Sequence, residues 1–365
     1  MALVALALVA VALVAAIGTA WYASGRLMAI VHVHDAYPLR VLAVNAGRSI
    51  VVLDRGPDAA EPGSFRLAWR GGQAIVGPVL ARTPATVTRR ISAMQGHLMT
   101  GLEVGIEPDR YTGNPMTALR LSFSTVSIPT HLSGMPAWYL PGRRSTWVIL
   151  IHGLGGSRAD TLPPMPTLHA LGYPMLAISY RNDAGAPQSP DHRNRLGASE
   201  WHDVAAAVAY ARGHHAGGIV LYGYSLGGAM ALNVARDPRI RPYIRGVVLD
   251  SPLLDWPATL NYAAERQGIP QPFAALTEAV LAWRDDIDYA QFDQLAHERE
   301  LRAPVLLFQG AADTVAPPEL AARFAHERPG LVTDVPVAGA DHVSAIDTAP
   351  STYEAALRRF LAPWP

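Results

Sequence analysis

The sequence predicts an α/β fold built around a mostly parallel, doubly wound sheet. Short apolar runs alternate with segments of helical periodicity along the C-terminal part of the chain, as buried strands and their crossover helices require. One run, Ile219–Tyr222, leads straight into a glycine-flanked serine and then a helix of small residues. At 365 residues the chain is longer than one such domain needs, so a second module is expected. The other runs expected to form strands of the sheet are Trp147–Ile151, Met175–Ile178, Val247–Leu249, Val305–Gln309 and Val332–Val337.

Residues 223–227 read Gly-Tyr-Ser-Leu-Gly and give the strongest local signal in the chain. A strand that turns sharply into a helix strains the backbone, and side chains two residues to either side of the corner would collide with the neighbouring strand and helix. Glycines at these two positions remove the collisions. The spacing is that of a nucleophile elbow, which presents one serine hydroxyl at the turn. It predicts Ser225 as a nucleophile.

A glycine-rich loop, residues 152–157, follows the first of the buried strands. Glycines leave backbone N–H groups open to a site, and acyl transfer needs such donors because its tetrahedral intermediate carries a negative charge on oxygen. We therefore expect the amides of Leu154 and of Leu226, the residue after the nucleophile, to form an oxyanion hole. His152, at the start of the loop, is expected to order it through a hydrogen bond; a role as the catalytic base is the less favoured alternative.

The absence of lysine argues against the alternative that this loop binds phosphate. The chain has 30 basic residues, and all of them are arginine. Walker-type phosphate loops, lysine Schiff bases and serine–lysine dyads all require a lysine. The loop also lacks the Gly-x-Gly-x-x-Gly spacing of dinucleotide sites.

A serine hydroxyl becomes a good nucleophile when a base takes its proton, and a third group must orient that base. Asp313 stands just beyond the strand Val305–Gln309, and His342 follows the next strand in the sequence Gly-Ala-Asp-His. Among 13 histidines, only this one lies in a glycine-containing loop about 30 residues after such an aspartate. We expect His342 to be the base and Asp313 the acid that orients it. Asp250, at the end of an earlier strand, is the alternative acid.

Together these motifs resemble those of the α/β-hydrolase superfamily, in particular its serine esterases and its lysophospholipase-like and aminopeptidase-like enzymes. The patterns His-Gly-x-Gly-Gly, Gly-x-Ser-x-Gly, Gly-x-x-Asp and Gly-x-Asp-His occur in that order within residues 121–365. The resemblance implies the α/β-hydrolase fold for this region and leaves the substrate open. It also implies a site made of Ser225 as nucleophile, Asp313 as acid, His342 as base, and Leu154 with Leu226 as oxyanion donors.

Composition limits the partners and cofactors. Thirty basic residues balance thirty acidic ones, which argues against nucleic acid or a strongly anionic partner. The chain has no cysteine, so disulfides, thiol nucleophiles and thiolate metal sites are excluded. The histidines and aspartates show no metal-ligand spacing on a recognisable helix. We expect neither a metal nor a cofactor, and a small-molecule ester as the partner.

Residues 2–23 form an uncharged apolar stretch, relieved only by one glycine and one threonine. At about 1.5 Å per residue, a helix of this length reaches roughly 33 Å, enough to cross the hydrocarbon core of a bilayer. The pair Trp21-Tyr22 at its end fits an interfacial aromatic anchor. We expect residues 1–25 to anchor the chain in a membrane. A cleaved signal peptide, followed by secretion, is the alternative.

Residues 26–120 contain short β-rich runs separated by glycine and proline turns, with little helical periodicity. Ser49–Leu53 and Ser64–Trp69 are expected to be strands. We expect a small β module here; an N-terminal extension of the main sheet is the alternative. From residue 121 the pattern becomes a β-hairpin, with strands at Thr125–Ile128 and Ala137–Leu140, that begins the larger domain.

Residues 253–301 interrupt the alternation at the place where α/β-hydrolases commonly insert a cap. The simplest interpretation of the apolar stripe on its second helix is that it packs the cap onto the core. The functional interpretation adds a pocket for apolar acyl groups. The stripe consists of Phe273, Leu276, Val280 and Trp283, and the pocket would be lined by Trp256, Phe273 and Trp283.

The sequence thus predicts a membrane-anchored serine hydrolase of carboxylic esters, and the apolar cap and the anchor favour a lipid-like acyl group. The same triad cleaves amides, so an amidase or aminopeptidase is the alternative. A peptidase must hold the amine of its substrate, so acidic cap residues facing Ser225 would favour it; the candidates are Asp285, Asp286 and Asp288. A non-catalytic binding protein on a hydrolase scaffold is a third alternative, which the complete set of motifs disfavours.

Overall fold

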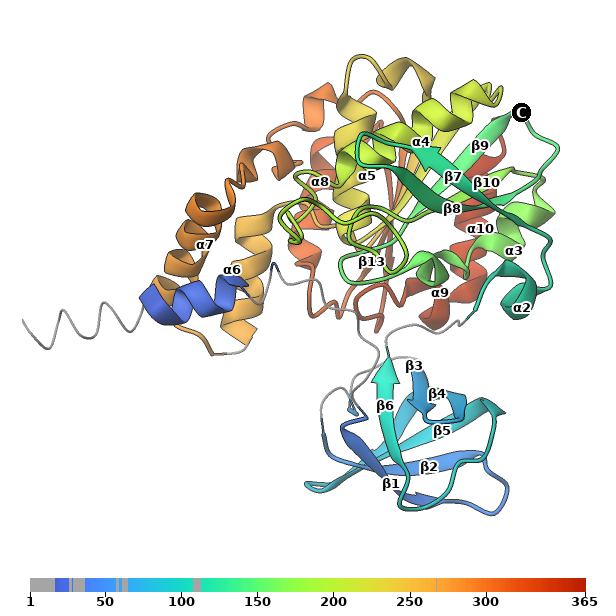
Figure 1. The fold of residues 1–365 in the computed structure, drawn as a ribbon, viewed down its shortest axis with the longest axis vertical. Helices are drawn as coiled ribbons and strands as arrows, with labels where there is room; N and C mark the ends of the chain where they lie inside the picture. Colours follow the sequence, from blue (N-terminus) through green and yellow to red (C-terminus); the bar gives the residue numbers. More distant parts are fainter. Residues whose placement is uncertain are drawn as a thin grey trace, which may run out of the picture.

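The computed structural model describes residues 17–25, 28, 37–56, 59–60, 65–107, 113–266 and 268–365. These residues form a small β-barrel, drawn in blue to teal in Figure 1, and a larger α/β domain. Each has its own hydrophobic core, so each can bury its apolar side chains without the other.

The N-terminal module is a closed barrel in the order β1-β2-β5-β4-β3-β6, in which β6 pairs back onto β1. Inward-facing side chains such as Val41, Val51, Leu67 and Val76 are buried in its core. Among the described residues, no barrel strand pairs with the larger sheet, which favours the separate module over the sheet extension. The strands are β1 (Leu39–Val44), β2 (Ile50–Asp54), β3 (Phe65–Trp69), β4 (Gly72–Arg82), β5 (Thr86–Gln95) and β6 (Glu103–Glu107).

The larger domain is built on an eight-stranded sheet in the order β14-β13-β12-β11-β9-β10-β8-β7. The predicted hairpin β7–β8 is antiparallel, β8 pairs antiparallel with β10, and the remaining neighbours are parallel. The strands are β7 (Ser124–Pro129), β8 (Gly134–Leu140), β9 (Thr146–Ile151), β10 (Met175–Ile178), β11 (Gly218–Tyr224), β12 (Ile244–Asp250), β13 (Val305–Gly310) and β14 (Val332–Val337).

Helices cover both faces of this sheet, and strands β9, β11 and β13 are accordingly buried at every position (Figure 1). One face packs on α4, α5 and α8, and the other on α3 and α10. The doubly wound α/β fold is therefore confirmed. The helices are α2 (Pro115–Leu119), α3 (Met165–Ala170), α4 (Trp201–Gly213), α5 (Leu226–Arg236), α6 (Trp256–Arg266), α7 (Gln271–Asp285), α8 (Pro318–Glu327), α9 (Ala345–Thr348) and α10 (Pro350–Leu361), with short 3-10 turns η1 (Arg158–Thr161), η2 (Arg241–Tyr243), η3 (Tyr289–Phe292) and η4 (Glu298–Glu300).

The cap helices α6 and α7 lie between β12 and β13, but the predicted apolar stripe of α7 is wrong at its end. Trp283 is 78% exposed, whereas Ala274 and Leu281 are buried. Ala274 and Leu281 are seven positions apart, about two helical turns, so these two side chains share one face of the helix. The face that packs inward is therefore rotated away from Trp283.

Among the described residues, no helix is both long and apolar enough to cross a membrane. Residues 17–25 are helical and contact α7. The guanidinium of Arg284 lies 4.0 Å from the ring centroid of Trp21 and donates to the Trp21 carbonyl at 3.1 Å. Residues 1–16, which hold most of the expected anchor, lie outside the described residues, so the anchor stays a prediction.

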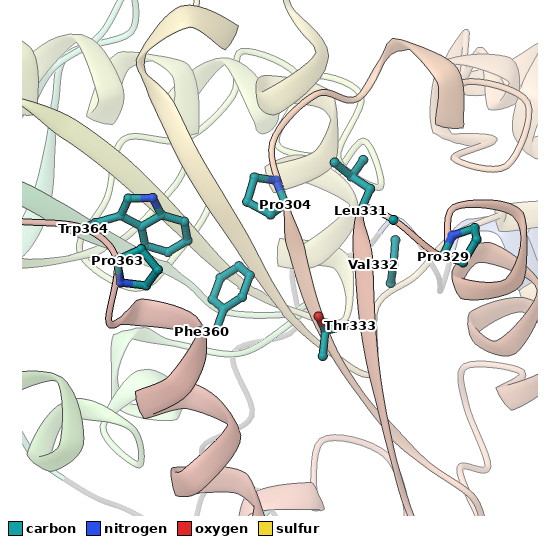
Figure 2. A pocket seen from close by; sticks show the side chains of 9 residues that line it. Pro304, Pro329, Leu331, Val332, Thr333, Phe360, Pro363 and Trp364 are labelled. Atoms are coloured by element: carbon teal, nitrogen blue, oxygen red, sulfur yellow. The ribbon is translucent and has the colours of Figure 1, made fainter.

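A cavity of about 240 Å³ opens at the N-terminal ends of β13 and β14 (Figure 2). Pro304, Leu331 and Val332 line it together with Phe360 and Trp364. The motifs predicted to carry chemistry follow the C-terminal ends of the same strands. This cavity therefore lies at the opposite edge of the sheet from the candidate site.

Candidate active site

Ser225 occupies a strained corner between β11 and α5, with φ 50° and ψ −118°. A Cβ added to Gly223 would lie 2.4 Å from the Gly227 carbonyl oxygen, and one added to Gly227 would lie 2.4 Å from the Ile151 carbonyl oxygen. Both glycines are thus required by close backbone approach. The strain costs about 1–3 kcal/mol and persists because the surrounding structure holds the turn. One such restraint is the 3.0 Å hydrogen bond from the Ser225 amide to the Asp250 carbonyl.

The structure brings together the three side chains that the motifs singled out. His342 Nε2 lies 3.0 Å from Ser225 Oγ. His342 Nδ1 lies 3.0 and 3.1 Å from the two carboxylate oxygens of Asp313. These distances permit a proton to pass from the hydroxyl to the imidazole while the carboxylate holds the opposite ring nitrogen.

Asp313 is 1% exposed and fully engaged in hydrogen bonds. The amides of Val315 and Ala316 donate to its Oδ1 at 2.8 and 2.7 Å, and Gln309 Nε2 donates to its Oδ2 at 3.0 Å. Burial alone would raise the pKa of this carboxyl, but the contact with His342 and the two amides outweigh burial and lower its pKa. Asp313 is therefore held as a carboxylate, the form that can orient an imidazole.

Asp341 connects two loops of the site: the acid loop, which follows β13 and carries Asp313, and the histidine loop, which follows β14 and carries His342. The sequence motifs did not predict this role. Its Oδ1 accepts from the His342 amide at 2.7 Å, from the Thr314 amide at 2.8 Å and from the Thr314 hydroxyl at 2.9 Å. The side chain thereby fixes the spacing between the residue after Asp313 and His342 itself. Its place directly before the histidine was the one available signal.

The alternative acid, Asp250, is buried beneath the site in a different network. Tyr353 Oη donates to its Oδ2 at 2.8 Å, and Tyr222 hydrogen-bonds the same Tyr353 hydroxyl. Burial raises the pKa of Asp250 to about 7. In this structure His342 Nδ1 contacts Asp313 and not Asp250.

The two expected oxyanion donors flank the nucleophile. Leu226 begins α5 directly after Ser225, and the backbone of Gly153, which precedes Leu154, lies beside the Ser225 side chain. A Cβ added to Gly153 would lie 3.2 Å from Ser225 Cβ. Within the part of the chain that the structure describes, the amides of Leu154 and Leu226 have no hydrogen-bond partner. Free amides beside a nucleophile are what an oxyanion hole requires.

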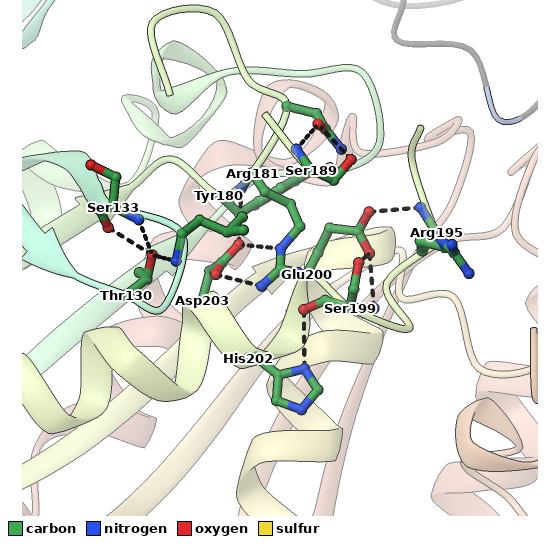
Figure 3. Close-up of polar contacts among 12 residues, drawn as sticks. Thr130, Ser133, Tyr180, Arg181, Ser189, Arg195, Ser199, Glu200, His202 and Asp203 are labelled. Atoms are coloured by element: carbon green, nitrogen blue, oxygen red, sulfur yellow. Dashed lines mark hydrogen bonds and ion pairs between the residues drawn. The ribbon is translucent and has the colours of Figure 1, made fainter. Parts of the chain in front are cut away.

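A polar network holds the loop between β10 and α4 (Figure 3). Arg181 makes a bidentate pair with Asp203, with both N···O distances at 2.8 Å. Buried Glu200 accepts from the amides of Arg195 and Gly197 at 2.7 and 3.0 Å, although burial raises the pKa of this carboxyl. These contacts leave the loop little freedom. The residues that make these contacts follow no regular spacing in the sequence, so no motif predicted them.

The three residues expected to line an acyl pocket have different environments. Trp256 is buried in the core and its indole N–H donates to the Leu196 carbonyl at 2.9 Å, so it holds the loop between β10 and α4. Phe273 is half-buried on α7. Trp283 points outward, where its ring centroid lies 6.1 Å from that of Trp21. Trp283 therefore lies at the surface of the cap and not in the wall of an enclosed pocket, because its side chain is 78% exposed.

Two family models match the chain. Residues 40–106 match a domain of unknown function (DUF8805), and residues 146–275 match the α/β hydrolase fold. No curated protein matches the chain.

Solved structures share the fold of the larger domain. The esterase Pf2001 of Pyrococcus furiosus is 20% identical with a TM-score of 0.56, and the match covers 69% of this chain and 96% of the esterase. DcsB, solved with a substrate analogue, is 18% identical with a TM-score of 0.50, covering 66% of this chain and 99% of DcsB. The sheet order, the family model and these matches show that the larger domain has the α/β-hydrolase fold.

Proposed function

We propose that this protein is a serine hydrolase that cleaves carboxylic esters through a covalent acyl-enzyme. The observation that carries the proposal is the continuous contact from Ser225 Oγ through the His342 ring to the buried carboxylate of Asp313. An imidazole held in this way takes the serine proton during attack and returns it to the leaving group.

The mechanism follows from the placement of these groups. Ser225 Oγ attacks the ester carbonyl, its proton moves to His342 Nε2, and Asp313 stabilises the imidazolium that forms. The amides of Leu154 and Leu226 stabilise the tetrahedral oxyanion. The alcohol leaves with the proton from His342, and water then repeats the sequence on the acyl-enzyme.

Apolar side chains around the triad support an apolar acyl group. Leu154, on the loop beside the nucleophile, is 39% exposed, and Val315, on the acid loop, is 44% exposed. The cap contacts the same acid loop, because Tyr262 of α6 donates to the Asp313 carbonyl at 2.8 Å. An apolar group bound between these loops would gain from removing their surface from water.

Labelling with a fluorophosphonate probe tests the proposal. We expect a single covalent adduct and turnover of p-nitrophenyl esters, with medium or long acyl chains preferred over acetate because of the apolar loops. Mass spectrometry of the labelled peptide and initial rates on an ester series measure both. A folded protein that neither reacts with the probe nor cleaves any ester would support the binding-protein alternative.

The amidase and aminopeptidase alternative has less support from the cap. Asp286 is exposed at the C-terminus of α7, and the Asp288 side chain accepts from the Ala290 amide at 3.0 Å as the cap of η3. Neither aspartate is thereby placed against the triad. Including p-nitroanilides of amino acids in the same panel separates the classes, since an aminopeptidase would cleave them faster than esters of the same size.

We also propose that the N-terminus binds a membrane, because residues 2–16 are uncharged and apolar in sequence and directly precede the helix at 17–25. The full-length chain should remain with membranes in high salt and alkaline carbonate, since hydrocarbon burial is not screened by ions. Deleting residues 1–16 should release an active enzyme that retains the helix on α7. Cell fractionation followed by ester assays measures both. A full-length chain in the soluble fraction would contradict the anchor, and a mature N-terminus near residue 26 in the medium would establish secretion.

A further inference from the structure

The direction of the Leu154 amide is set by the carbonyl of the residue before it. The Gly153 C=O and the Leu154 N–H belong to one peptide group, and in a trans peptide these two bonds point in opposite directions. The described chain contains no cis peptide bond. Groups that hold the Gly153 carbonyl therefore determine where the Leu154 N–H points.

Two buried side chains contact that carbonyl oxygen. The hydroxyl of Tyr180 donates to it at 2.7 Å, and Nδ1 of His152 lies 2.9 Å from it. The Tyr180 side chain reaches the loop from the end of β10, and its ring stacks on the His152 ring with centroids 4.3 Å apart. Both residues are buried, at 3% and 0% exposure, so water does not compete for these contacts.

Asp183 holds both contacts in place. Its Oδ2 lies 2.8 Å from His152 Nε2 and accepts from the Tyr180 amide at 2.8 Å. The two ring nitrogens of His152 thus face a carboxylate and a carbonyl, which are both acceptors. A ring nitrogen that carries a hydrogen can donate to the acceptor it faces.

We propose that Tyr180, His152 and Asp183 are positioning residues that aim the Leu154 N–H at the oxyanion of the transition state. Gly153 lies against the Ser225 side chain, so the peptide they hold is next to the reacting atoms. Donors on the carbonyl also polarise the peptide group and strengthen its N–H as a donor. The proposal rests on the proposed hydrolase function, because it assigns a role within that mechanism.

Tyr180→Phe tests the proposal, because it removes one donor and keeps the ring that stacks on His152. Loss of a whole oxyanion donor costs about 10²–10³-fold in kcat. A donor that remains but is poorly aimed should cost about tenfold, with KM changed less than about twofold. The affinity for a trifluoromethyl ketone, whose adduct with the serine carries the oxyanion, should fall by the same factor as kcat. Kinetics on one ester and inhibition constants measure the three quantities.

The matched control is Tyr210→Phe, which removes a hydroxyl from a half-buried tyrosine of α4 that stacks on His214. It should leave kcat and the ketone affinity unchanged. If Tyr180→Phe does not fold, Asp183→Asn provides the test, since an amide weakens the contact with His152 and keeps an acceptor for the Tyr180 amide.

Two results would overturn the assignment. One is an unchanged kcat and ketone affinity in the folded variant. The other is a raised KM with an unchanged kcat, which would show that Tyr180 contributes to substrate binding alone. A wild-type protein without probe labelling or ester turnover would instead contradict the proposed function, so the two failures can be told apart.

Discussion

Replacing Ser225 with alanine should abolish ester turnover, because it removes the hydroxyl that lies 3.0 Å from His342 Nε2 and would attack the carbonyl. In serine hydrolases of this mechanism the loss in kcat reaches about 10⁶-fold. The variant should keep its fold, since the turn is set by Gly223, Gly227 and backbone hydrogen bonds and not by the hydroxyl. Initial rates on p-nitrophenyl esters, with thermal unfolding of the same preparation, measure both expectations.

A second serine provides the control for this substitution. Ser145 is exposed before β9, and its hydroxyl donates to the Pro365 carbonyl at 3.3 Å. Ser145→Ala should retain full turnover and full labelling by a fluorophosphonate. Turnover by a pure Ser225→Ala preparation at a rate near that of the wild type would remove Ser225 from the mechanism.

The fold could be predicted from sequence because burial on both faces leaves a strong local trace. Strands such as Trp147–Ile151 and Val305–Gln309 are apolar at nearly every position, and the structure places each of them inside the sheet with a neighbouring strand on either side. The nucleophile elbow could also be predicted from sequence, because the backbone approaches so closely at Gly223 and Gly227 that only glycine fits. Such signals depend on neighbours in the chain and need no tertiary information.

The groups that support the site left weaker traces. Asp341, Tyr180 and Asp183 act through contacts between loops that follow different strands, and a single polar residue in a loop has no periodicity to mark it. These loops meet because the C-terminal ends of parallel strands share one edge of the sheet. Only the assembled sheet shows which of the many loop aspartates and tyrosines arrive together.

The cap shows a different failure, in which a real periodicity was extended to a residue that does not pack inward. Val280 of the predicted stripe is buried, together with Ala274 and Leu281, but Trp283 at the end of the stripe is exposed. Apolar spacing identifies a helix and does not say which partner each face meets. The Trp283 ring instead contacts Trp21 of the helix at 17–25, a contact between segments more than 250 residues apart.

Replacing Asp313 with asparagine should lower kcat by about 10⁴-fold, since the amide would favour the wrong tautomer of His342 and could not stabilise the imidazolium. KM should change little, because Asp313 does not reach the substrate. The hydrogen bonds from the Val315 and Ala316 amides can still be accepted by the asparagine oxygen, so folding should be retained. Steady-state kinetics across pH 5 to about 9 measure the loss and show that pH does not rescue it.

The matched variant is Asp250→Asn, which should leave kcat within about tenfold of the wild type because His342 Nδ1 contacts Asp313.

The effect of Asp250→Asn should appear in the free energy of unfolding. The unfolded chain releases the Asp250 proton near pH 4, whereas burial raises the folded pKa to about 7. Between these values the folded state binds more protons, so this carboxyl makes the wild type lose stability as pH rises, and the full cost is present above pH 7. The unfolding free energy of Asp250→Asn relative to wild type should therefore increase across that window. If Asp250→Asn instead lost about 10⁴-fold in kcat while Asp313→Asn stayed active, the acid of the triad would be Asp250.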